Sequence, residues 1–436
     1  MKRYTLRNEL QAINNFHMIA YSIITILLFI YLSFNVGYLL LFSISGLIRA
    51  SAIYTSANTK RKIAILIPTY KEDAIILDSA KNALRQDYPS DKFDVFVIAD
   101  QLKDETLSQL KILPINLITV SFEKSTKAKS LKFALQAIPE DDYSVIMILD
   151  SDNIMTQGCL EKINHAFDAG YKIVQLHRTA KNRNTPIAIL DAISEEINNH
   201  IFRKGHRALG LSSALIGSGM AFTYEDFKSV MTNTDIEDNP GEDREIYLEL
   251  LKKGITCEYI DGGLIFDEKV SSRKILEKQR TRWISAQLQY ARRFWLREFF
   301  RTFSYNIHYF DYAVQTILLP RVILLLSISS ITILSIFLGI ATEFTIYPNT
   351  FWWTILAIGC TVSFIISIYK KISLKELWKA ISGLPGAIYA IGVAFSNSNA
   401  NQKDFIHTPK EFLSFDEKKL NIRANVTDFS GKKLNR

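Results

Sequence analysis

Val145-Ile146-Met147-Ile148-Leu149-Asp150-Ser151-Asp152 is the stretch that decides the fold of this chain. Five apolar residues in a row, followed at once by two carboxylates, are typical of a buried strand that ends at a polar edge. Residues two apart can face the same way, so Asp150 and Asp152 can converge on one hard cation, for which Mg²⁺ or Mn²⁺ is the natural candidate. The alternative is a turn in which the Asp side chains cap the next helix.

Segments of the same kind lie on both sides of this stretch, and helical segments separate them. Strands that alternate with helices indicate βαβ units, so we expect an α/β fold with a doubly wound, mostly parallel sheet. The predicted strands are Ile63–Ile67 (stopped by Pro68-Thr69), Phe93–Ala99, Ile115–Phe122, Val145–Leu149 and Lys172–Leu176, and the predicted helices are Asp78–Gln86, Ser130–Ala137 and Leu160–Ala169.

Polar residues follow three of these strands. Pro68-Thr69-Tyr70 follows the first strand, Asp100 the second and Asp150-Ser151-Asp152 the fourth. Ligands of doubly wound sheets bind beyond the carboxyl ends of the strands, so we expect a binding site at this edge. The sequence has neither a G-x-G-x-x-G fingerprint after the first strand nor a Walker A motif, which argues against a dinucleotide fold and a P-loop NTPase.

Four side chains near this edge are candidate contacts for a nucleotide. Asp100 could accept a hydrogen bond from a nucleobase N–H or from ribose hydroxyls. Tyr70 could stack on a base with Glu72 beside it, and Lys129 could meet a phosphate. Each residue also fits an ordinary role, because loop carboxylates and single Tyr or Lys residues are common at protein surfaces.

Glu242-Asp243 opens a predicted helix in the segment GEDREIYLELLKKG, which ends at Gly254. Acidic residues in a first helical turn are favoured by the helix dipole whatever the function. The functional interpretation makes Asp243 a general base that takes a proton from an attacking hydroxyl. A second acidic pair, Glu237-Asp238, lies just upstream and competes for this role.

Gln279-Arg280-Thr281-Arg282-Trp283 combines an amide, two guanidinium groups and an indole just before the chain becomes strongly apolar. Guanidinium groups suit diphosphate oxygens, and an indole face suits the C–H face of a sugar ring. A basic amphipathic helix at a membrane surface would show the same residues. The two interpretations are compatible.

Three long apolar segments, Phe16–Ile48, Thr316–Ala341 and Phe351–Tyr369, predict an integral membrane protein. Lys and Arg concentrate beside these segments, which places the soluble part in the cytoplasm by the positive-inside rule. The net charge of +8 therefore does not indicate nucleic-acid binding, since aromatic stacking motifs are also absent. The three cysteines, Cys159, Cys257 and Cys360, have no metal-ligand spacing.

Two paths of the chain through the membrane are compatible with the sequence at each end of the membrane part. Phe16–Ile48 is one long helix or a hairpin that turns near Asn35-Val36-Gly37, and the positive charge at both ends favours the hairpin. Leu377–Phe395 is interrupted by Gly383-Leu384-Pro385-Gly386, and we expect a broken helix in the interface rather than a third crossing. The predicted parts are an N-terminal anchor (1–50), a cytosolic catalytic domain (51–300), C-terminal membrane or interfacial helices (301–400) and a cytosolic tail (401–436).

The order of these motifs resembles the D, DxD, D, QxxRW pattern of the inverting, membrane-integrated family 2 glycosyltransferases, which include cellulose, hyaluronan and mannan synthase-like enzymes. The pattern falls here on Asp100, Asp150-Ser151-Asp152, Glu242-Asp243 and Gln279–Trp283. Ile67–Glu72 resembles the family's P-T-Y-N-E opening, with Lys71 in place of Asn. The resemblance spans roughly Ile63 to Lys410 and implies a GT-A-like nucleotide-sugar domain.

The resemblance assigns roles to further residues. Lys127-Ala128-Lys129 is similar to a lysine segment near the nucleotide, and Gly217-Ser218-Gly219 to a small-residue loop under the acceptor. Phe405-Ile406-His407-Thr408-Pro409-Lys410 is similar to a gating motif of processive members, although His407 departs from the usual residue. The implied donor-binding residues are Thr69, Tyr70, Glu72, Asp100, Lys129, Asp150, Gln279, Arg280 and Arg282; the acceptor-binding residues are Trp283, Gly217, Ser218 and Gly219; the gating residues are Phe405, His407, Thr408 and Lys410.

The expected activity is transfer of a sugar from a nucleoside diphosphate, UDP in the first place, with inversion to a β-linkage. Asp152 with Asp150 would hold Mg²⁺ or Mn²⁺, and Asp243 would deprotonate the acceptor. The expected product is a polysaccharide made at a bacterial inner membrane, within a possible envelope assembly. Two alternatives remain: a single addition to a lipid acceptor, and a non-catalytic sugar-nucleotide-binding scaffold subunit.

Overall fold

The computed structural model describes residues 2–49, 54, 57, 59–139, 142–234, 236–237, 239, 241–342 and 346–399, with side chains from Phe16 onward. The predicted gating segment Phe405–Lys410 and Asp238 lie outside these residues. The chain divides into two compact units, Met1–Ile44 with Leu318–Tyr369, and Ser45–Ile317 with Lys370–Arg436. We describe each unit by itself.

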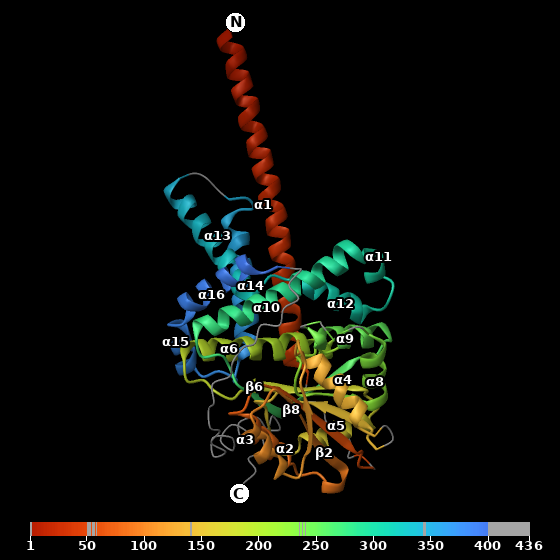
Figure 1. Ribbon diagram of the computed structural model, residues 1–436. Coiled ribbons are helices and arrows are strands. Elements are labelled where there is room, and N and C mark those ends of the chain that lie inside the picture. The colour runs from red at the N-terminus through yellow and green to blue at the C-terminus, as the bar shows by residue number, and fades with distance from the viewer. Residues whose placement is uncertain are drawn as a thin grey trace. The chain divides into compact units, whose positions relative to one another are not determined.

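The larger unit is built on an eight-stranded sheet with the order β3-β2-β1-β4-β7-β6-β8-β5 (Figure 1). β1 to β4 pair in parallel, as do β6 and β8, whereas β7 is antiparallel to β4 and β6, and β5 is antiparallel to β8. The predicted α/β fold with a mostly parallel sheet is thereby confirmed. The strands are β1 (Ile63–Tyr70), β2 (Phe93–Asp100), β3 (Asn116–Val120), β4 (Val145–Ile148), β5 (Ile154–Met155), β6 (Ile173–Ala180), β7 (Met220–Thr223) and β8 (Cys257–Asp267).

Helices cover both faces of this sheet, and the alternation of β1 shows why its sequence is apolar throughout. Ala64 and Leu66 pack into the cluster that contains α4, α8 and α9, whereas Ile63, Ile65 and Ile67 pack into the cluster that contains α2 and α5. The elements around the sheet are α2 (Ile76–Ala83), η1 (Ser90–Lys92), α3 (Asp104–Lys111), α4 (Lys127–Ala137), α5 (Cys159–Asp168), α6 (Pro186–Asn198), η2 (Asn199–Gly205), α7 (His206–Ala208), α8 (Tyr224–Asn233), α9 (Glu242–Lys252), α10 (Arg273–Arg292), η3 (Arg293–Arg297), α11 (Phe299–Thr302) and α12 (Ile307–Thr316).

The predicted stop of the first strand at Pro68 is wrong, because β1 continues to Tyr70. Pro68 pairs with Ile98 of β2, but the pairing with β4 has already ended at Leu66. A proline costs no ladder hydrogen bond on an unpaired side of a strand. The longer strand carries Thr69 and Tyr70 to the same edge as Asp100.

The smaller unit contains α1 (Lys2–Ile48), α13 (Arg321–Ala341) and α14 (Thr350–Ile368). Within the described residues, three helical segments are long and apolar enough to cross a membrane: Phe16–Ile48, Arg321–Ala341 and Thr350–Ile368. The Thr332 hydroxyl donates to the carbonyl of Trp353 at 3.2 Å, and the Ser43 hydroxyl donates to the carbonyl of Ser363 at 2.8 Å. Such hydrogen bonds through small side chains join helices whose other contacts are apolar.

The predicted hairpin at Asn35-Val36-Gly37 is also wrong, because α1 passes through these residues without a break. The Asn35 amide donates to the carbonyl of Tyr31 at 2.8 Å and accepts from the backbone N–H of Leu319 at 2.8 Å, so its polar groups are satisfied inside the helical unit. One glycine costs a helix only about 1 kcal/mol, which is too little to break a long apolar segment.

The predicted interruption near Gly383 is confirmed. α15 (Leu374–Ile381) and α16 (Leu384–Asn397) meet there at an angle of 60°. A Cβ atom on Gly383 would lie 2.8 Å from Pro186, so only glycine lets this corner approach α6. α16 then packs along α10, and the Ser398 hydroxyl donates to the carbonyl of Thr281 at 3.3 Å. The placement of the pair in the membrane interface stays a prediction.

Candidate active site

A cavity of about 420 Å³ opens at the carboxyl ends of β1, β2 and β4, where the sequence predicts a ligand. The first turn of α9 and the middle of α10 close it from the other side. Of the predicted site residues, Thr69, Tyr70, Glu72, Asp100, Asp150, Asp152, Gly217, Asp243, Gln279, Arg282 and Trp283 line this cavity.

Three carboxylates lie together in the cavity. One oxygen atom from each of Asp150, Asp152 and Asp267 lies within 4.8 Å of the others. Asp152 and Asp267 are buried, whereas a third of the Asp150 side chain is exposed. Because divalent cations prefer several carboxylate oxygens, this group fits Mg²⁺ or Mn²⁺.

Asp267 is a site residue that our sequence analysis missed. It ends β8, and an apolar strand that stops at a carboxylate is the same signal that identifies Asp150. The Asp152 carboxylate is held by the backbone N–H of Glu268 at 2.9 Å, the residue after Asp267. The ends of β4 and β8 are therefore joined at the carboxylate group.

Within the segment Lys127-Ala128-Lys129, Lys127 lines the cavity, in place of the predicted Lys129. Its ammonium donates to Asp150 at 2.5 Å and to the carbonyl of Gly217 at 2.6 Å. The Lys129 ammonium instead donates to the carbonyl of Lys124, and Lys129 does not line the cavity. Residues two apart on a helix point to different faces, so α4 can present only one of the two lysines.

The ion pair between Lys127 and Asp150 shifts both groups toward their charged forms. Burial alone would lower the pKa of Lys127, but Asp150 and Glu242 raise it above its ordinary value. Burial alone would raise the pKa of Asp150, but Lys127 and Arg178 lower it. The site thus keeps a carboxylate and an ammonium side by side at neutral pH.

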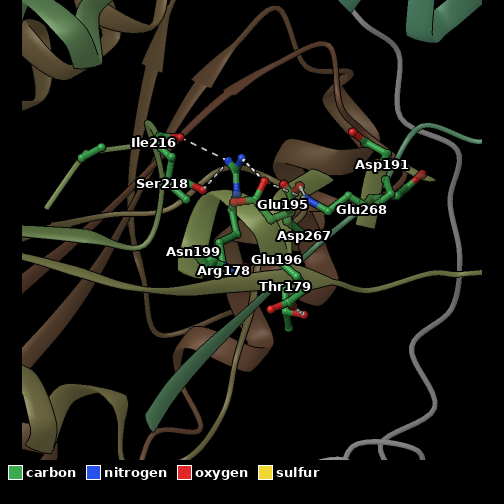
Figure 2. A network of polar contacts seen from close by, with 12 residues as sticks. Arg178, Thr179, Asp191, Glu195, Glu196, Asn199, Ile216, Ser218, Asp267 and Glu268 are labelled. Atoms are coloured by element: carbon green, nitrogen blue, oxygen red, sulfur yellow. Dashed lines mark hydrogen bonds and ion pairs between the residues drawn. The ribbon is translucent and has the colours of Figure 1, made fainter. Parts of the chain in front are cut away.

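A buried network of charges supports the carboxylates from β6 and α6. Figure 2 shows the Arg178 guanidinium between Ile216 and Ser218 on one side and Glu195 on the other. Arg178 donates to Glu195 at 3.0 Å, and the Lys269 ammonium donates to Asp267 at 2.7 Å and to Glu195 at 3.4 Å. Burial opposes the charge on Glu195, but Arg178 and Lys269 hold its pKa far below the ordinary value.

Glu242 and Asp243 both line the cavity at the start of α9. Burial and the neighbouring Asp243 raise the pKa of Glu242 to about 7, although Lys127 opposes the shift. The Asp243 side chain accepts from the backbone N–H of Arg244 at 2.8 Å. One of two adjacent acids is thus poised to exchange a proton near neutral pH.

The glycine loop lies directly beneath Asp243. A Cβ atom on Gly217 would lie 3.3 Å from Oδ2 of Asp243, and the φ of Gly217 is +81°. Ser218 is buried and its hydroxyl accepts from Arg178 at 3.4 Å. Gly219, with φ +63°, packs against Ile265 and does not line the cavity. Of the three predicted acceptor residues in the loop, only Gly217 therefore faces the cavity.

The competing acidic pair lies elsewhere. The Glu237 carboxylate is 40% exposed and pairs with the Lys132 ammonium at 2.5 Å, and Glu237 does not line the cavity. Asp238 lies outside the described residues. Of the two acidic pairs, Glu242-Asp243 is thus the one shown to line the cavity, and the role of Asp243 as general base stays a prediction.

The five residues Gln279–Trp283 of α10 divide between two faces of the helix, and the three that QxxRW specifies share one face. Gln279, Arg282 and Trp283 line the cavity. Arg280 does not; it donates to Asp191 at 2.5 Å, and its guanidinium lies 4.3 Å from the ring centroid of Trp283. Burial lowers the pKa of Arg282, which Glu242, Asp243 and Asp150 partly offset. Arg282 is thus the guanidinium that faces the carboxylates.

Several buried polar atoms in the cavity have no hydrogen-bond partner within the described part of the chain. They are both carboxylate oxygens of Asp100, the Ser125 hydroxyl, Nε of Arg178 and Oε1 of Gln279. Burial raises the pKa of Asp100. Unpaired buried polar groups cost about 1–3 kcal/mol each, so hydrogen bonds from a polar ligand to these atoms would be favourable.

The chain is similar to solved structures. The mannosyltransferase PcManGT from Pyrobaculum calidifontis, in complex with GDP-Man and Mn²⁺, is similar with a TM-score of 0.50 and 14% identity, over 86% of this chain and 98% of that chain. Glucosyl-3-phosphoglycerate synthase from Mycobacterium tuberculosis, in complex with Mn²⁺, UDP and glucosyl-3-phosphoglycerate, is similar over 46% of this chain and 70% of that chain, with a TM-score of 0.33 and 15% identity. A comparison with curated proteins finds no match.

The chain is a glycosyltransferase with a GT-A-like fold. The family model described as glycosyltransferase like family 2 matches residues 60–286, just over half of the chain. The chain therefore belongs to this family. Its match covers the whole set of cavity residues from Pro68 to Ala286.

Proposed function

We propose that the cavity binds a nucleoside-diphosphate sugar, UDP-linked in the first place, with one Mg²⁺ or Mn²⁺, and transfers the sugar with inversion to form a β-glycosidic bond. The observation that supports this most is the shared cavity. Asp243 and Arg282 line the same cavity as the three carboxylates, with Trp283 at its edge. Such a transfer needs a base for the acceptor hydroxyl, a cation that binds the leaving diphosphate and an aromatic ring that stacks on the acceptor sugar.

The nucleoside end of the donor is proposed to lie at the ends of β1 and β2. Asp100 and Ser125 offer unpaired buried oxygens there, which suit N–H groups of a base or hydroxyls of a ribose. Tyr70 lines the same part of the cavity and offers a ring for stacking. The donor would then run toward the carboxylate group along the edge of the sheet.

The diphosphate is proposed to lie among the cations of the cavity. Asp150, Asp152 and Asp267 would hold the metal ion, which when bound neutralises charge on the departing diphosphate. Arg282 lines the same cavity as Asp150, and it is proposed to contact a phosphate bound there. A guanidinium suits this role because its donors match two phosphate oxygens at once.

Asp243 is proposed to accept the proton of the acceptor hydroxyl as that oxygen attacks C1 of the sugar. Gly217 leaves open space directly against Oδ2 of Asp243, since any side chain there would crowd it. Trp283 would hold the acceptor ring on the cavity side, because Arg280 already covers one face of its indole. The inversion follows from a single displacement with base and leaving group on opposite sides of C1.

We propose that the reaction takes place at the cytoplasmic face of a membrane, the bacterial inner membrane in the first place, and extends a polysaccharide. The three candidate spans and the basic residues that flank them support this placement. A single addition to a lipid acceptor is the alternative. Product size separates the two, because a lipid product carries one sugar and a polymer elutes early on size exclusion.

The test uses membranes that contain the full chain, offered a panel of UDP- and GDP-sugars with Mg²⁺ or Mn²⁺. Nucleotide release and product size are measured together. Asp243→Asn should bind donor normally and lose about 10²–10⁴-fold in turnover, which is the usual contribution of a general base. Glu237→Gln, which removes the competing acid, should retain wild-type turnover. Near-wild-type transfer by Asp243→Asn would show that the base is assigned wrongly.

A further inference from the structure

A second cavity, of about 360 Å³, lies on the other face of β6 and β8. Its floor is made by two cross-strand pairs, His177 with Leu264 and Thr179 with Phe266. Arg178 and Asp267, which are the next residues along the same strands, line the catalytic cavity instead. Because successive strand residues face opposite sides of a sheet, the two cavities are separate sites with a shared wall.

Basic side chains surround this second cavity. Arg183 comes from the segment before α6, and Lys370 and Lys371 come from the segment between α14 and α15. Lys370 has a φ of +61°, a left-handed conformation that is uncommon for a residue other than glycine. Strained residues of this kind concentrate at ligand-binding sites.

The two carboxylates that line the cavity are already satisfied by the protein. Glu196 accepts from Thr179 at 2.7 Å and lies 3.3 Å from the His177 ring. Glu376 accepts from Arg183 at 3.1 Å and from the hydroxyl and backbone N–H of Ser373 at 2.8 and 3.0 Å. Three cations against two carboxylates leave the lining with a net charge of +1 when His177 is neutral.

Arg183 has an N–H donor that no acceptor in the described part of the chain engages. One terminal nitrogen of Arg183 serves both Glu376 and the carbonyl of Lys371, while Nε is buried and has no partner in the described part of the chain. A buried guanidinium N–H without an acceptor is costly, and an anionic oxygen would relieve that cost. Within the described residues, Nε of Arg183 therefore has no acceptor, and the lining around it carries a net positive charge.

We propose that this second cavity binds a phosphate group. Arg183, Lys370 and Lys371 supply the three cations, and Leu264 and Phe266 supply an apolar floor that suits the carbon part of a phosphate ester. Two sources share this chemistry: an anionic lipid headgroup and a soluble phosphate. The lipid source is supported by the chain path, because Lys370 follows two residues after the candidate span that ends at Ile368.

The experiment compares the full chain, purified in a neutral detergent, with two double variants of equal charge. Lys370→Gln with Lys371→Gln removes two cations of the cavity. Lys375→Gln with Lys379→Gln removes two cations of the adjacent α15 that do not line it. The probes are phosphatidylglycerol, read as adducts by native mass spectrometry, and inorganic phosphate, read by calorimetry. Unchanged nucleotide release shows that each variant is folded.

The wild-type chain and the Lys375→Gln, Lys379→Gln variant should bind phosphatidylglycerol or inorganic phosphate. The Lys370→Gln, Lys371→Gln variant should bind the same probe about tenfold more weakly or not at all. Arg183→Lys, which keeps the charge but removes Nε, should give an intermediate loss. A phosphatidylglycerol adduct that inorganic phosphate does not displace identifies the lipid source; binding of phosphate alone identifies the soluble source. Equal binding by the two double variants, or no binding by the wild type, overturns the proposal.

Discussion

The Lys127 ammonium donates to the Asp150 carboxylate at 2.5 Å, inside the group of carboxylates that fits a divalent cation. A lysine and a metal ion at this place compete for the same carboxylate charge. The neutralising lysine explains how three acids can lie together before a metal ion binds.

Lys127→Met should therefore strengthen the binding of Mn²⁺ to the chain without nucleotide, by about threefold to tenfold, because a competing positive charge is removed. The same change should weaken binding of a nucleoside diphosphate. Calorimetric titration with Mn²⁺ and with UDP measures both constants. Lys129→Met is the matched control and should change neither, since Lys129 donates to the carbonyl of Lys124 outside the cavity. Weaker Mn²⁺ binding by Lys127→Met would contradict the competition.

Asp267→Asn should weaken Mn²⁺ binding by about a hundredfold, because an amide is a poorer ligand than a carboxylate and Lys269 beside it loses one of its two carboxylate partners. The measurement is Mn²⁺ titration followed by electron paramagnetic resonance. Asp261→Asn changes an acid on the same strand that pairs with Lys204, and it should bind Mn²⁺ like the wild type. Normal affinity in Asp267→Asn would remove this residue from the metal site.

Glu242 should make the stability of the chain depend on pH. Its pKa is about 7 in the folded chain against an ordinary value of 4.5, so the folded state binds more protons between these values. The contribution of Glu242 to the free energy of unfolding is therefore largest below about pH 4.5. It falls by about 3 kcal/mol as the pH rises from there through 7.

Unfolding of the detergent-solubilised chain followed between pH 5 and pH 8 measures this slope, and Glu242→Gln should flatten it. Glu249→Gln, on the outer side of the same helix beside Lys252, should keep the wild-type slope. A Glu242→Gln profile that still falls steeply through neutral pH would assign the proton to another group.

Substitutions of Arg282 and Arg280 should change the donor KM by different amounts. Arg282→Lys should raise the donor KM by about tenfold or more, because lysine lacks the two-pronged contact to phosphate oxygens. Arg280→Lys should leave the donor KM within about threefold, since Arg280 pairs with Asp191 and covers Trp283. Initial rates of nucleotide release against donor concentration give both values. The reverse order would mean that α10 turns its other face to the donor.

The strands and their polar ends were predictable because both signals are local. An apolar run that stops at a carboxylate, as at Asp150, places that carboxylate at the ligand edge of a parallel sheet whatever surrounds it. The family pattern adds Asp243 and Trp283, and both line the cavity. The same local signal is present at Asp267, and it went unused because Cys257–Asp267 lies beyond the strands that we predicted.

The predictions that the structure corrected depended on sequence signals whose energies are small compared with those of helix packing. The charge at both ends of Phe16–Ile48 favoured a hairpin at Asn35, but a single glycine at the predicted turn leaves an apolar segment helical when the Asn35 amide is satisfied. Lys129 fits the lysine segment as well as Lys127 does, whereas Arg280 stands at an unspecified position of QxxRW, in which Arg282 is the arginine. The rotation of each helix about its axis decided which residue of each pair lines the cavity.

By itself, the sequence determined that this protein has a parallel α/β core with acids at its strand ends and apolar segments on both sides. Strand burial and strand alternation follow from the order of residues along the chain. The tertiary structure alone decided that Asp267 joins Asp150 and Asp152, and that His177 and Arg178 serve different cavities. These relationships depend on which strands lie side by side and on which helix face is buried, and both are set by packing between segments that are distant along the chain.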